Sequence, residues 1–465
     1  MIVRRAAGSF RDPAGYVVHS DDAIYRLLMP AGRESYEQLM ASGLYARLTE
    51  SGLLVPHEEV TQPGVLDRSA WRAIKPKHLP LVTYPYEWSF SAWRDAALLT
   101  LRIQRLALQH GMMLKDASAF NIQFEGCRPI FIDTLSIERL KPGPWRAYRQ
   151  FCQQFLAPLA LMAYRDVRLG RLFRVHPEGI PLDLASTLLP SRTWARPGVL
   201  LHVHLHALAE TRLRSSRATR RTGPAGPGGA KGMRPTHQNE ALLDSLERAI
   251  RALSWTPAGG WTSYERQTPS YSERAMSHKL GIVDAWLSRL RPQQVWDLGA
   301  NTGRFSRLAL KHGAYTVALD EDPGCVEMLY RREREAGGGR LLPLVVDLAA
   351  PSPALGWAHE ERSALADRGP ADLLLALAIV HHLAIGRGIP FAQIAQYFAR
   401  LGRTLIIEFV PGDDPLAQPL LQRAPDHAAG YTQQAFEDAF TRQFRIEESV
   451  SITDSTRSLY LMVRP

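Results

Sequence analysis

Cysteine is scarce in this chain, with three residues, Cys127, Cys152 and Cys325, among 465. They lie far apart and form no CxxC pair, so neither a disulfide framework nor a structural zinc site is indicated. The sequence also has no run of about 18 apolar residues, the length needed to cross a bilayer. Residues 1–5 are not followed by an apolar segment of the signal-peptide type. These absences predict a cytoplasmic protein with reduced thiols and no membrane span.

Acidic residues are missing from one stretch, residues 211–239, which carries seven Lys and Arg residues. Subtracting these seven from the formal net charge of +10 leaves +3 for all other residues. The stretch contains the Gly- and Pro-rich segment 223–229, so it has almost nothing to bury. No aromatic residues are interleaved to stack on bases, so a nucleic-acid partner is not expected. The stretch is predicted to be a basic linker between a domain at 1–210 and a domain at 240–465.

Apolar runs and helical patterns alternate from residue 295 onward. Strands are expected at 295–298, 315–319, 341–346, 372–378 and 404–409, with helices at 303–312, 323–335 and 389–401. A final strand at 459–463 is expected to pair antiparallel with residues 444–449. This alternation predicts an α/β domain, with a doubly wound, mostly parallel sheet that binds ligands at the carboxyl ends of its strands.

The first strand and helix of this domain enclose a tight turn, Gly299-Ala-Asn-Thr-Gly303. Asp297 lies in the strand before the turn, and Asp320 closes the next apolar run, where a carboxylate can accept hydrogen bonds from both ribose hydroxyls of a nucleoside. A dinucleotide site requires a middle glycine so that the backbone can approach a pyrophosphate, but Asn301 stands there. A nucleoside cofactor without a pyrophosphate is therefore favoured over a nicotinamide dinucleotide.

This stretch resembles motif I of the class I S-adenosylmethionine-dependent methyltransferases. Val345-Val-Asp347, the run 371–383 and Thr404 to Phe409 follow in the order of that family. The resemblance covers about residues 240–465 and implies S-adenosylmethionine as the cofactor. It implies that Asp297, with Gly299, Ala300, Asn301 and Gly303 of the turn, holds the methionine end, that Asp320 binds the ribose, and that Asp347 accepts from the adenine amino group. Asp347 is alternatively a cap for the helical turn that follows it.

His381 and His382 follow the fourth strand, where the methyl acceptor is expected to enter. A histidine with an ordinary pKa of about 6.5 is a suitable proton acceptor at neutral pH. Either histidine is alternatively a group that orients the substrate or packs under the loop. The Asn-Pro-Pro-Tyr sequence typical of enzymes that methylate exocyclic amines of bases or glutamine is absent. Oxygen, carbon and sulfur acceptors stay open, and a small-molecule or glycan substrate is expected.

A second motif lies in the N-terminal half, where Asp116 is followed by Asn121 and then by Asp133 in a short hairpin. This arrangement resembles the catalytic and metal-binding loops of the protein kinase and aminoglycoside phosphotransferase superfamily. The resemblance covers about residues 10–210 and implies an α+β kinase-like domain with Asp116 as the base, Asn121 and Asp133 as magnesium ligands, and ATP as the nucleotide. The alternative is that these are turn and cap residues.

Several residues that an active kinase needs are not found. No glycine-rich phosphate loop precedes Tyr16, Leu114 and Lys115 replace the catalytic-loop His and Arg, and Arg26 stands at the expected place of the strand lysine. The sequence therefore predicts a kinase-like fold and leaves its activity open. The two-part layout is also similar to that of bacterial proteins grouped with nodulation-associated methyltransferases.

Other local patterns predict elements of the N-terminal half and of the segment before the turn. A hairpin is expected over 15–29, helices over 35–48, 92–110, 145–164 and 239–254, and strands near 73–74 and 81–84. The alternating His202, His204 and His206 suggest a metal site only if they lie on a strand, and the surrounding pattern favours a helix. A helix over 273–290 precedes the turn. The resemblance to the methyltransferases implies that the aromatic residues at 261–271 with Lys279 lie over the cofactor; these aromatic residues are alternatively the packing face of a cap.

Three alternatives to a methyltransferase with a non-catalytic first domain follow from these patterns. The chain is alternatively a bifunctional enzyme that phosphorylates and methylates, a nicotinamide-dependent oxidoreductase, or a binding scaffold with two degenerate domains. Asn301 disfavours the oxidoreductase. The scaffold predicts no stabilisation by any cofactor.

Overall fold

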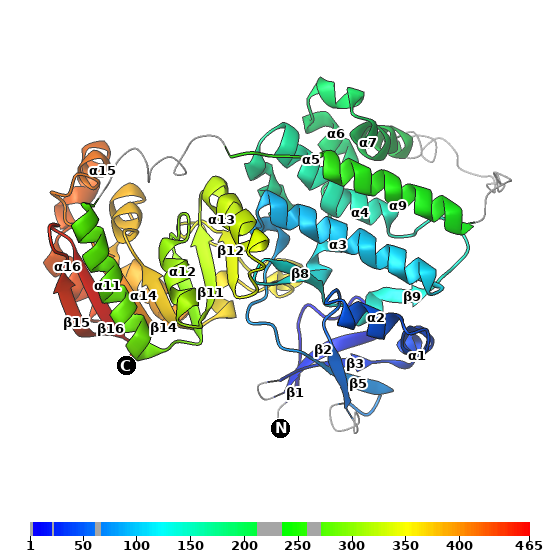
Figure 1. Cartoon of the computed structure of the whole chain (residues 1–465), viewed down its shortest axis with the longest axis horizontal. Helices are drawn as coiled ribbons and strands as arrows, with labels where there is room; N and C mark the ends of the chain where they lie inside the picture. The colour runs from blue at the N-terminus through cyan, green and yellow to red at the C-terminus, as the bar shows by residue number, and fades with distance from the viewer. Residues whose placement is uncertain (1–2, 21–22, 61–66, 212–234, 258–270) are drawn as a thin grey trace.

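The computed structural model describes residues 3–20, 23–60, 67–211, 235–257 and 271–465. Figure 1 shows two halves side by side, with the N-terminal half on the right and the C-terminal half on the left. Most of the predicted basic linker and the aromatic residues at 261–264 lie outside the described residues.

The first half begins with a five-stranded antiparallel sheet in the order β1-β2-β3-β5-β4. Its strands are β1 (Val3–Arg5), β2 (Gly15–Ser20), β3 (Ala23–Leu28), β4 (His57–Val60) and β5 (Arg72–Pro76). The predicted hairpin is confirmed as β2 and β3, with Tyr16 opposite Leu27. The strand β4 was not predicted, because its sequence His-Glu-Glu-Val carries no apolar alternation; it lies at the sheet edge, where polar residues stay in water.

Two predictions for this region are wrong. The helix expected over 35–48 is divided into α1 (Arg33–Ala41) and α2 (Leu44–Glu50). Gly43 between them has φ +76°, a left-handed conformation that ends a helix. The strand expected at 81–84 belongs to no sheet, because this segment leads directly into the helical turn η3 (Pro85–Glu87).

Helices and two short hairpin-like sheets complete the first half. The central helix α3 (Phe90–Gln109) is capped by Ser89 and confirms the prediction over 92–110. The short strands pair as β6 (Met112–Leu114) with β9 (Ile137–Arg139) and β7 (Ile122–Glu125) with β8 (Arg128–Phe131). The remaining elements are η4 (Ala119–Asn121), η5 (Thr134–Ser136), α4 (Tyr148–Phe151), η6 (Cys152–Leu156), α5 (Ala157–Tyr164), η7 (Val167–Arg174), α6 (Leu182–Leu188), η8 (Ser191–Ala195), α7 (Pro197–Val199) and η9 (Leu200–Leu205).

The predicted domain boundary at residue 240 falls inside the helix α9 (Pro235–Ala252). It lies beside α3 (Figure 1) and packs against the first half rather than the second. Asn239 accepts a hydrogen bond from the Trp145 backbone, and Arg105 contacts Glu247 at 3.1 Å. The apolar face of α9 needs a neighbour to bury it, and α3 supplies that neighbour, so the first half extends to about residue 253.

The second half is built on a seven-stranded sheet in the order β12-β11-β10-β13-β14-β16-β15. Its strands are β10 (Gln294–Leu298), β11 (Tyr315–Asp320), β12 (Leu341–Val345), β13 (Ala371–Ala376), β14 (Gly402–Phe409), β15 (Arg445–Ser451) and β16 (Ser458–Val463). The first five are parallel, and β16 runs antiparallel to both β14 and β15. The doubly wound sheet with an antiparallel edge pair is confirmed.

Helices cover both faces of this sheet. They are α11 (Glu273–Leu290), α12 (Arg304–Lys311), α13 (Pro323–Glu335), α14 (Phe391–Leu401), α15 (Gln418–Arg423) and α16 (Gln433–Phe440), with helical turns η11 (Trp357–His359), η12 (Leu365–Arg368), η13 (His382–Gly386) and η14 (Pro425–Gly430). Successive strand residues point to opposite faces. Val295 and Leu373 pack in the cluster with α11, whereas Trp296 and Leu374 belong to a core that continues into the first half.

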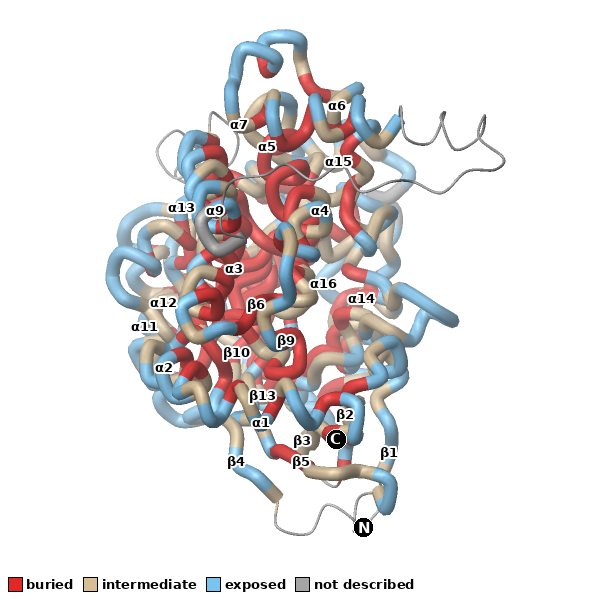
Figure 2. Tube along the Cα trace, turned by 90° about the vertical axis from the view of Figure 1, so that its right-hand side faces the viewer, coloured by how far each residue is buried: buried red, intermediate tan, exposed pale blue. Residues whose placement is uncertain are grey.

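The two halves are joined by this shared core and by buried polar contacts. Figure 2 shows the buried segments, among them α3, β10 and β13, running through the middle of the molecule. Ser91 of α3 donates to Glu327 of α13 at 2.5 Å, and Arg368 contacts Glu87 at 2.5 Å. The halves therefore form one packed unit, and separating them would expose charges that now have partners.

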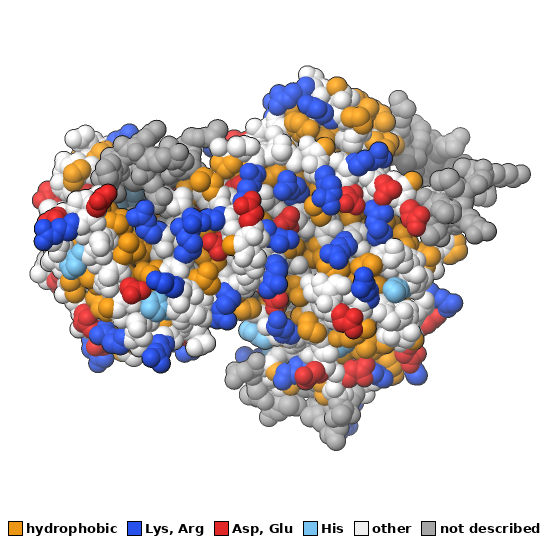
Figure 3. Space-filling model, viewed as in Figure 1, with side chains coloured by type: hydrophobic (Ala, Val, Ile, Leu, Met, Phe, Trp, Pro, Cys, Tyr) orange, Lys and Arg blue, Asp and Glu red, His pale blue; other side chains and the backbone are white. Residues whose placement is uncertain are grey.

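The visible surface mixes charges of both signs. Figure 3 shows Lys and Arg side chains interspersed with Asp and Glu across both halves. No helix in the described part of the chain is long and apolar enough to cross a membrane.

Candidate active site

The second sheet has its topological switch point between β10 and β13. From β10 the chain moves outward to β11 and β12, and from β13 it moves outward to β14 on the other side. The loops at the carboxyl ends of these two strands diverge, and ligands of doubly wound sheets bind in the crevice between them. A cavity of about 700 Å³ lies here. Its lining includes the predicted site residues Asp297, Gly299, Ala300, Asn301, Asp320, Asp347, His381 and His382.

The turn after β10 has the backbone that its sequence predicts. Gly299 and Gly303 have φ of +77° and +80°, and Asn301 has φ of +49°. Asparagine tolerates the left-handed region better than most residues, so it can stand where a dinucleotide site has glycine. Gly303 does not line the cavity but is the residue before α12, where the Leu329 side chain occupies the space that a Cβ would need. Its role in this structure is to shape the turn.

Replacing Gly303 by alanine is expected to lower the free energy of unfolding by about 2–3 kcal/mol. A Cβ at this position would lie 2.6 Å from Leu329 Cδ1, and the left-handed backbone adds about 1–2 kcal/mol of strain. Gly313→Ala is the matched control, because Gly313 has φ +85° with nothing within 4 Å of its Cβ position. Chemical denaturation should show only the smaller strain for Gly313→Ala. Equal losses in the two variants would contradict the contact with Leu329.

The N–H groups of the turn are all engaged within the chain. Those of Gly299 and Ala300 both donate to the Leu319 carbonyl, at 2.8 and 3.0 Å. The Asn301 N–H donates to Asp320 Oδ2 at 2.7 Å, and the next two donate to Asn301 Oδ1 and to the Ala300 carbonyl. A phosphate group would require such N–H groups to be free. Gly299 and Ala300 can therefore meet a ligand through their Cα and carbonyl groups, but not through these amides.

Two carboxyl groups of the cavity have raised pKa values. Asp297 is 3% exposed and accepts a hydrogen bond from the Ser306 hydroxyl at 2.6 Å. Burial raises its pKa to about 6, although the Ser306 contact opposes the shift. Burial likewise raises the pKa of Asp320 to about 6, against the opposing N–H groups of Asp322 and Asn301. A ligand that supplies positive charge or hydrogen-bond donors would stabilise the ionised form of both groups.

Asp347 caps a turn and also lines the cavity. Its Oδ1 accepts from the Ala349 N–H at 2.9 Å, which caps the turn after β12. Its Oδ2 lies 3.8 Å from Arg387, and the residue lines the cavity. Capping uses one oxygen only, so the second oxygen can still accept from a ligand.

A buried charged network that reaches the cavity through Tyr271 and Lys279 was not predicted. Lys279 of α11 donates to Glu408 of β14 at 2.6 Å and to the Tyr271 hydroxyl at 3.1 Å. Arg457 lies 3.7 Å from Glu408 and makes a two-point contact with Asp414 at 2.7 and 2.9 Å. Burial raises the pKa of Glu408 to about 7, although Arg457 opposes the shift. The network joins segments up to 186 residues apart (271 and 457), which no local pattern connects.

One signal in the sequence does point to this network. Ala275, Lys279 and Val283 recur at a spacing of four on α11, and all three are buried. A lysine on the apolar stripe of a helix must find a partner when it is buried. That partner is Glu408, near the carboxyl end of β14.

The two histidines lie just past the end of β13. Their rings are 4.2 Å apart between centroids, and burial lowers the pKa of both. The nearby Ala378 has φ +53° although it is not a glycine. Strained backbone of this kind is concentrated at functional sites.

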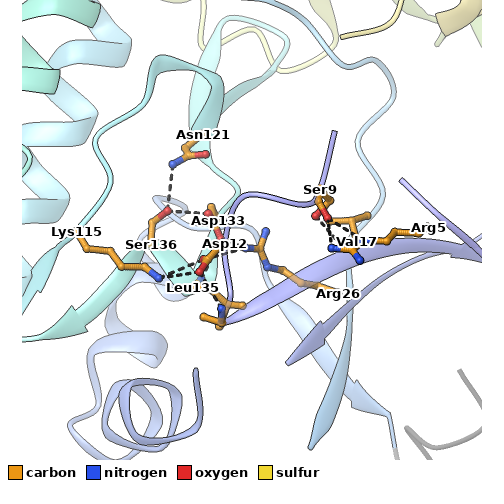
Figure 4. A network of polar contacts seen from close by, with 11 residues as sticks. Arg5, Ser9, Asp12, Val17, Arg26, Lys115, Asn121, Asp133, Leu135 and Ser136 are labelled. Atoms are coloured by element: carbon orange, nitrogen blue, oxygen red, sulfur yellow. Dashed lines mark hydrogen bonds and ion pairs between the residues drawn. The ribbon is translucent and has the colours of Figure 1, made fainter. Parts of the chain in front are cut away.

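The predicted kinase-like residues Asp116, Asn121 and Asp133 lie close together in the first half, and Figure 4 shows Asn121 and Asp133 on either side of Ser136. Asp116 and Asn121 are hydrogen-bonded, and burial followed by the charge of Asp133 raises the pKa of Asp116. Asn121 donates to the Ser136 hydroxyl at 3.0 Å, and Ser136 donates to Asp133 at 2.7 Å. Asp133 also caps η5, so the prediction of a turn residue describes it equally well.

Basic side chains occupy the space around this cluster. Figure 4 shows Arg26 pointing at Asp133, with a distance of 2.9 Å, and Lys115 pointing at Asp12, with a distance of 3.1 Å. In the described ranges, no group of three or more His, Cys, Asp and Glu side chains is placed to hold a metal ion.

The three alternating histidines bind separate partners on a helical segment. His202 contacts Tyr148 and Ser245, and His204 contacts Ser186 and Thr193. His206 stacks on Tyr148 and lies 3.3 Å from Glu210. Their side chains diverge, as predicted for a helix.

The comparisons with known proteins give one relative along the whole chain. The sequence is 34% identical over 467 residues to the nodulation protein NoeA of Rhizobium meliloti (strain 1021), covering 99% of this chain and 96% of that protein. No family model matches the chain.

Solved structures are similar over less than half of the chain. Magnesium protoporphyrin IX methyltransferase (ChlM) from Synechocystis PCC 6803, with bound SAH, is 19% identical over 44% of this chain and 94% of its own, at a TM-score of 0.33. The bifunctional kinase-methyltransferase WbdD is 18% identical over 43% of this chain and 42% of its own, at a TM-score of 0.30. TM-scores this low do not establish a shared fold.

Proposed function

The chain belongs to the family of the nodulation protein NoeA, and from that premise we propose that its second half transfers a methyl group from S-adenosylmethionine to a small-molecule or glycan acceptor. One observation carries the proposal. Asp297, Asp320 and Asp347 come from three neighbouring strands and line one cavity at the switch point of the sheet.

The chemistry of these residues fits the cofactor. S-adenosylmethionine presents an ammonium group, two ribose hydroxyls and an adenine amino group, all of which are hydrogen-bond donors. Asp297 would hold the ammonium group, Asp320 the ribose hydroxyls and Asp347 the amino group, because ionised carboxylates only accept. When bound, the cofactor supplies a methyl group on a positively charged sulfur.

The turn favours this cofactor over a dinucleotide. A pyrophosphate needs free N–H groups at the start of a helix, whereas those of residues 299–303 already have acceptors within the chain. The protein's own contribution is to position the acceptor and exclude water, and the apolar side chains of Met276, Phe305 and Leu416 help by lining the cavity.

We assign no phosphoryl transfer to the first half, since Asp133 is paired with Arg26 and Lys115 with Asp12. Among the described residues, those that line the cavity come from positions 271–416, so the first half contributes none of them. Binding of Mg²⁺-ATP that Asp133→Ala abolishes would favour a bifunctional enzyme instead. Cytoplasmic location and the lack of a nucleic-acid partner stay predictions from the sequence.

Calorimetric titration of the full chain with S-adenosylmethionine and with NAD tests the proposal. Saturable binding of S-adenosylmethionine, and none of NAD, is the expected result. Binding of NAD alone would identify an oxidoreductase, and binding of neither would identify a scaffold.

The affinity for S-adenosylmethionine is expected to fall about tenfold between pH 7 and pH 5. The pKa of Asp297 is about 6, so the group is mostly protonated below that pH and can no longer attract the ammonium group. Protonation of Asp320 has less effect, because a carboxyl group still hydrogen-bonds to hydroxyls. Calorimetry at pH 5, 6, 7 and 8 measures the change, and Asp297→Asn should remove most of it. A pH-independent affinity in the unmodified protein would contradict the role of Asp297.

A further inference from the structure

The inner wall of the cavity points to a hydroxyl group as the methyl acceptor, and we propose that His381 accepts the proton of that hydroxyl. The inference rests on the proposed function and narrows its substrate class from oxygen, carbon or sulfur compounds to alcohols or phenols. The bond from oxygen to methyl forms as the bond from sulfur to methyl breaks. The hydroxyl proton passes to His381, and S-adenosylhomocysteine leaves as a neutral thioether.

His381 is the polar side chain of the wall that most clearly lacks a partner. It is 0% exposed and lines the cavity, yet neither Nδ1 nor Nε2 has a hydrogen-bond partner in the described part of the chain. Buried polar groups without partners are rare and call for an explanation. A ligand in the cavity that brings a hydroxyl group would supply the missing contact.

The surroundings of His381 keep its ring neutral. The charged and titratable groups that act on it are His382 from its own turn, Arg457 and Lys279. Glu408 lies between the two cations, 2.6 Å from Lys279 and 3.7 Å from Arg457. Burial lowers the pKa of His381 well below its ordinary range, and these three groups add to the effect. A neutral imidazole has one lone pair, so it can accept a hydrogen bond from a hydroxyl group at neutral pH. It takes the proton only as the methyl group leaves the sulfur, when the positive charge of the sulfonium is lost from the cavity.

The charged network behind His381 disfavours ionic acceptors. Lys279 and Arg457 contact Glu408, and Arg457 also contacts Asp414, so the basic and acidic groups of the network are already paired with one another. An ammonium acceptor would find no free carboxylate in this network, and a carboxylate acceptor no uncompensated cation. A carboxylate acceptor also has no proton to lose. A neutral hydroxyl matches both the paired network and the open imidazole.

The test uses the full chain, S-adenosylmethionine with a tritiated methyl group, and three matched probes. These are 4-nitrophenyl β-D-glucoside with hydroxyls only, 4-nitrophenyl β-D-glucosaminide with an added amine, and 4-nitrophenyl β-D-glucuronide with an added carboxylate. Label should enter all three as methyl ethers, which resist alkali. Label confined to the amine or to an alkali-labile ester would overturn the inference, and so would the absence of ether from every probe.

The variant His381→Phe separates catalysis from folding. Removal of a proton acceptor is expected to lower the rate of ether formation about 10²- to 10⁴-fold. Affinity for S-adenosylmethionine should stay within threefold, and the melting temperature should hold or rise, because a buried polar group without a partner is lost. The control is His312→Gln, since His312 contacts Asp284 at 2.8 Å and does not line the cavity; its rate should not change.

These measurements distinguish a failure of the proposed hydroxyl acceptor and its base from a failure of the proposed methyltransferase function. If His381→Phe forms ether at a rate within fivefold of the unmodified chain, His381 is not the proton acceptor. If S-adenosylmethionine binds but no hydroxyl is methylated, the hydroxyl class is wrong and the cofactor assignment stands. If S-adenosylmethionine does not bind at all, the proposed function itself fails.

Discussion

Replacement of Asp320 by alanine is expected to weaken the binding of S-adenosylmethionine by about 100-fold. Its carboxylate accepts from the N–H groups of Asn301 and Asp322 at 2.7 and 2.9 Å. A carboxylate has about four acceptor sites, so two remain for the ribose hydroxyls. A hydrogen bond to a charged group contributes about 1.5–3 kcal/mol. Loss of two such bonds, at about 3 kcal/mol in total, corresponds to two orders of magnitude in the dissociation constant.

Asp372, at the amino end of β13 in the same sheet, provides a matched control for Asp320. Asp372 also accepts from two backbone N–H groups, those of Gln293 and Gln294 at 3.0 and 2.9 Å. Asp372→Ala removes the same kind of backbone contact at the amino end of β13, away from the cavity lining. Calorimetry should show unchanged affinity for Asp372→Ala, with comparable losses of melting temperature in both variants. An affinity of Asp320→Ala within threefold of the unmodified chain would contradict the ribose assignment.

Arg368→Ala is expected to lower the free energy of unfolding by about 3–5 kcal/mol. Arg368 contacts both oxygens of Glu87 at 2.5 and 2.9 Å, and the two side chains are 4% and 0% exposed. Burial alone would raise the pKa of Glu87, but Arg368 opposes it and the pKa is lowered. The pair therefore stabilises the fold above the unfolded pKa of Glu87, and this stability is lost as the pH falls. Without Arg368, an ionised Glu87 would be buried without the cation that contacts both of its oxygens.

Two further variants separate the loss of the ion pair from other effects. Arg400 contacts Asp367 at 3.4 Å, but both side chains are more than half exposed, so Arg400→Ala should cost less than about 1 kcal/mol. The double replacement Glu87→Gln with Arg368→Met should recover part of the stability, because the charge without a partner is gone. Equal denaturation midpoints for Arg368→Ala and Arg400→Ala would show that the buried pair does not hold the halves together.

The helices and strands of the second half could be predicted closely because each is specified by residues that are close together in the sequence. Helices were expected over 273–290 and 323–335, and the structure has them over those residues. Each parallel strand is a short run of apolar residues buried on both faces, so the start and end of the strand can be recognised in the sequence. Asp297, Asp320 and Asp347 could be placed for the same reason, since all carboxyl ends of parallel strands meet at one edge.

The first half was predicted less well because its elements depend on distant partners. The polar strand β4 is recognisable only when β5 is beside it. The helix α9 looks like the start of the second domain, but its apolar face is buried by α3, which lies more than 120 residues earlier in the sequence. Local propensity cannot indicate which half will cover such a face.

The sequence by itself determined the wound sheet, the tight turn after its first strand and the carboxylates at the strand ends, because these depend on residues close together in the chain. Only the tertiary structure decided that Lys279, Glu408 and Arg457 form one buried network, that His381 faces the cavity without a partner, and that Arg26 is paired with Asp133. The physical reason is that a buried charge or imidazole is defined by what surrounds it, and its neighbours come from segments that the chain brings together only when it folds.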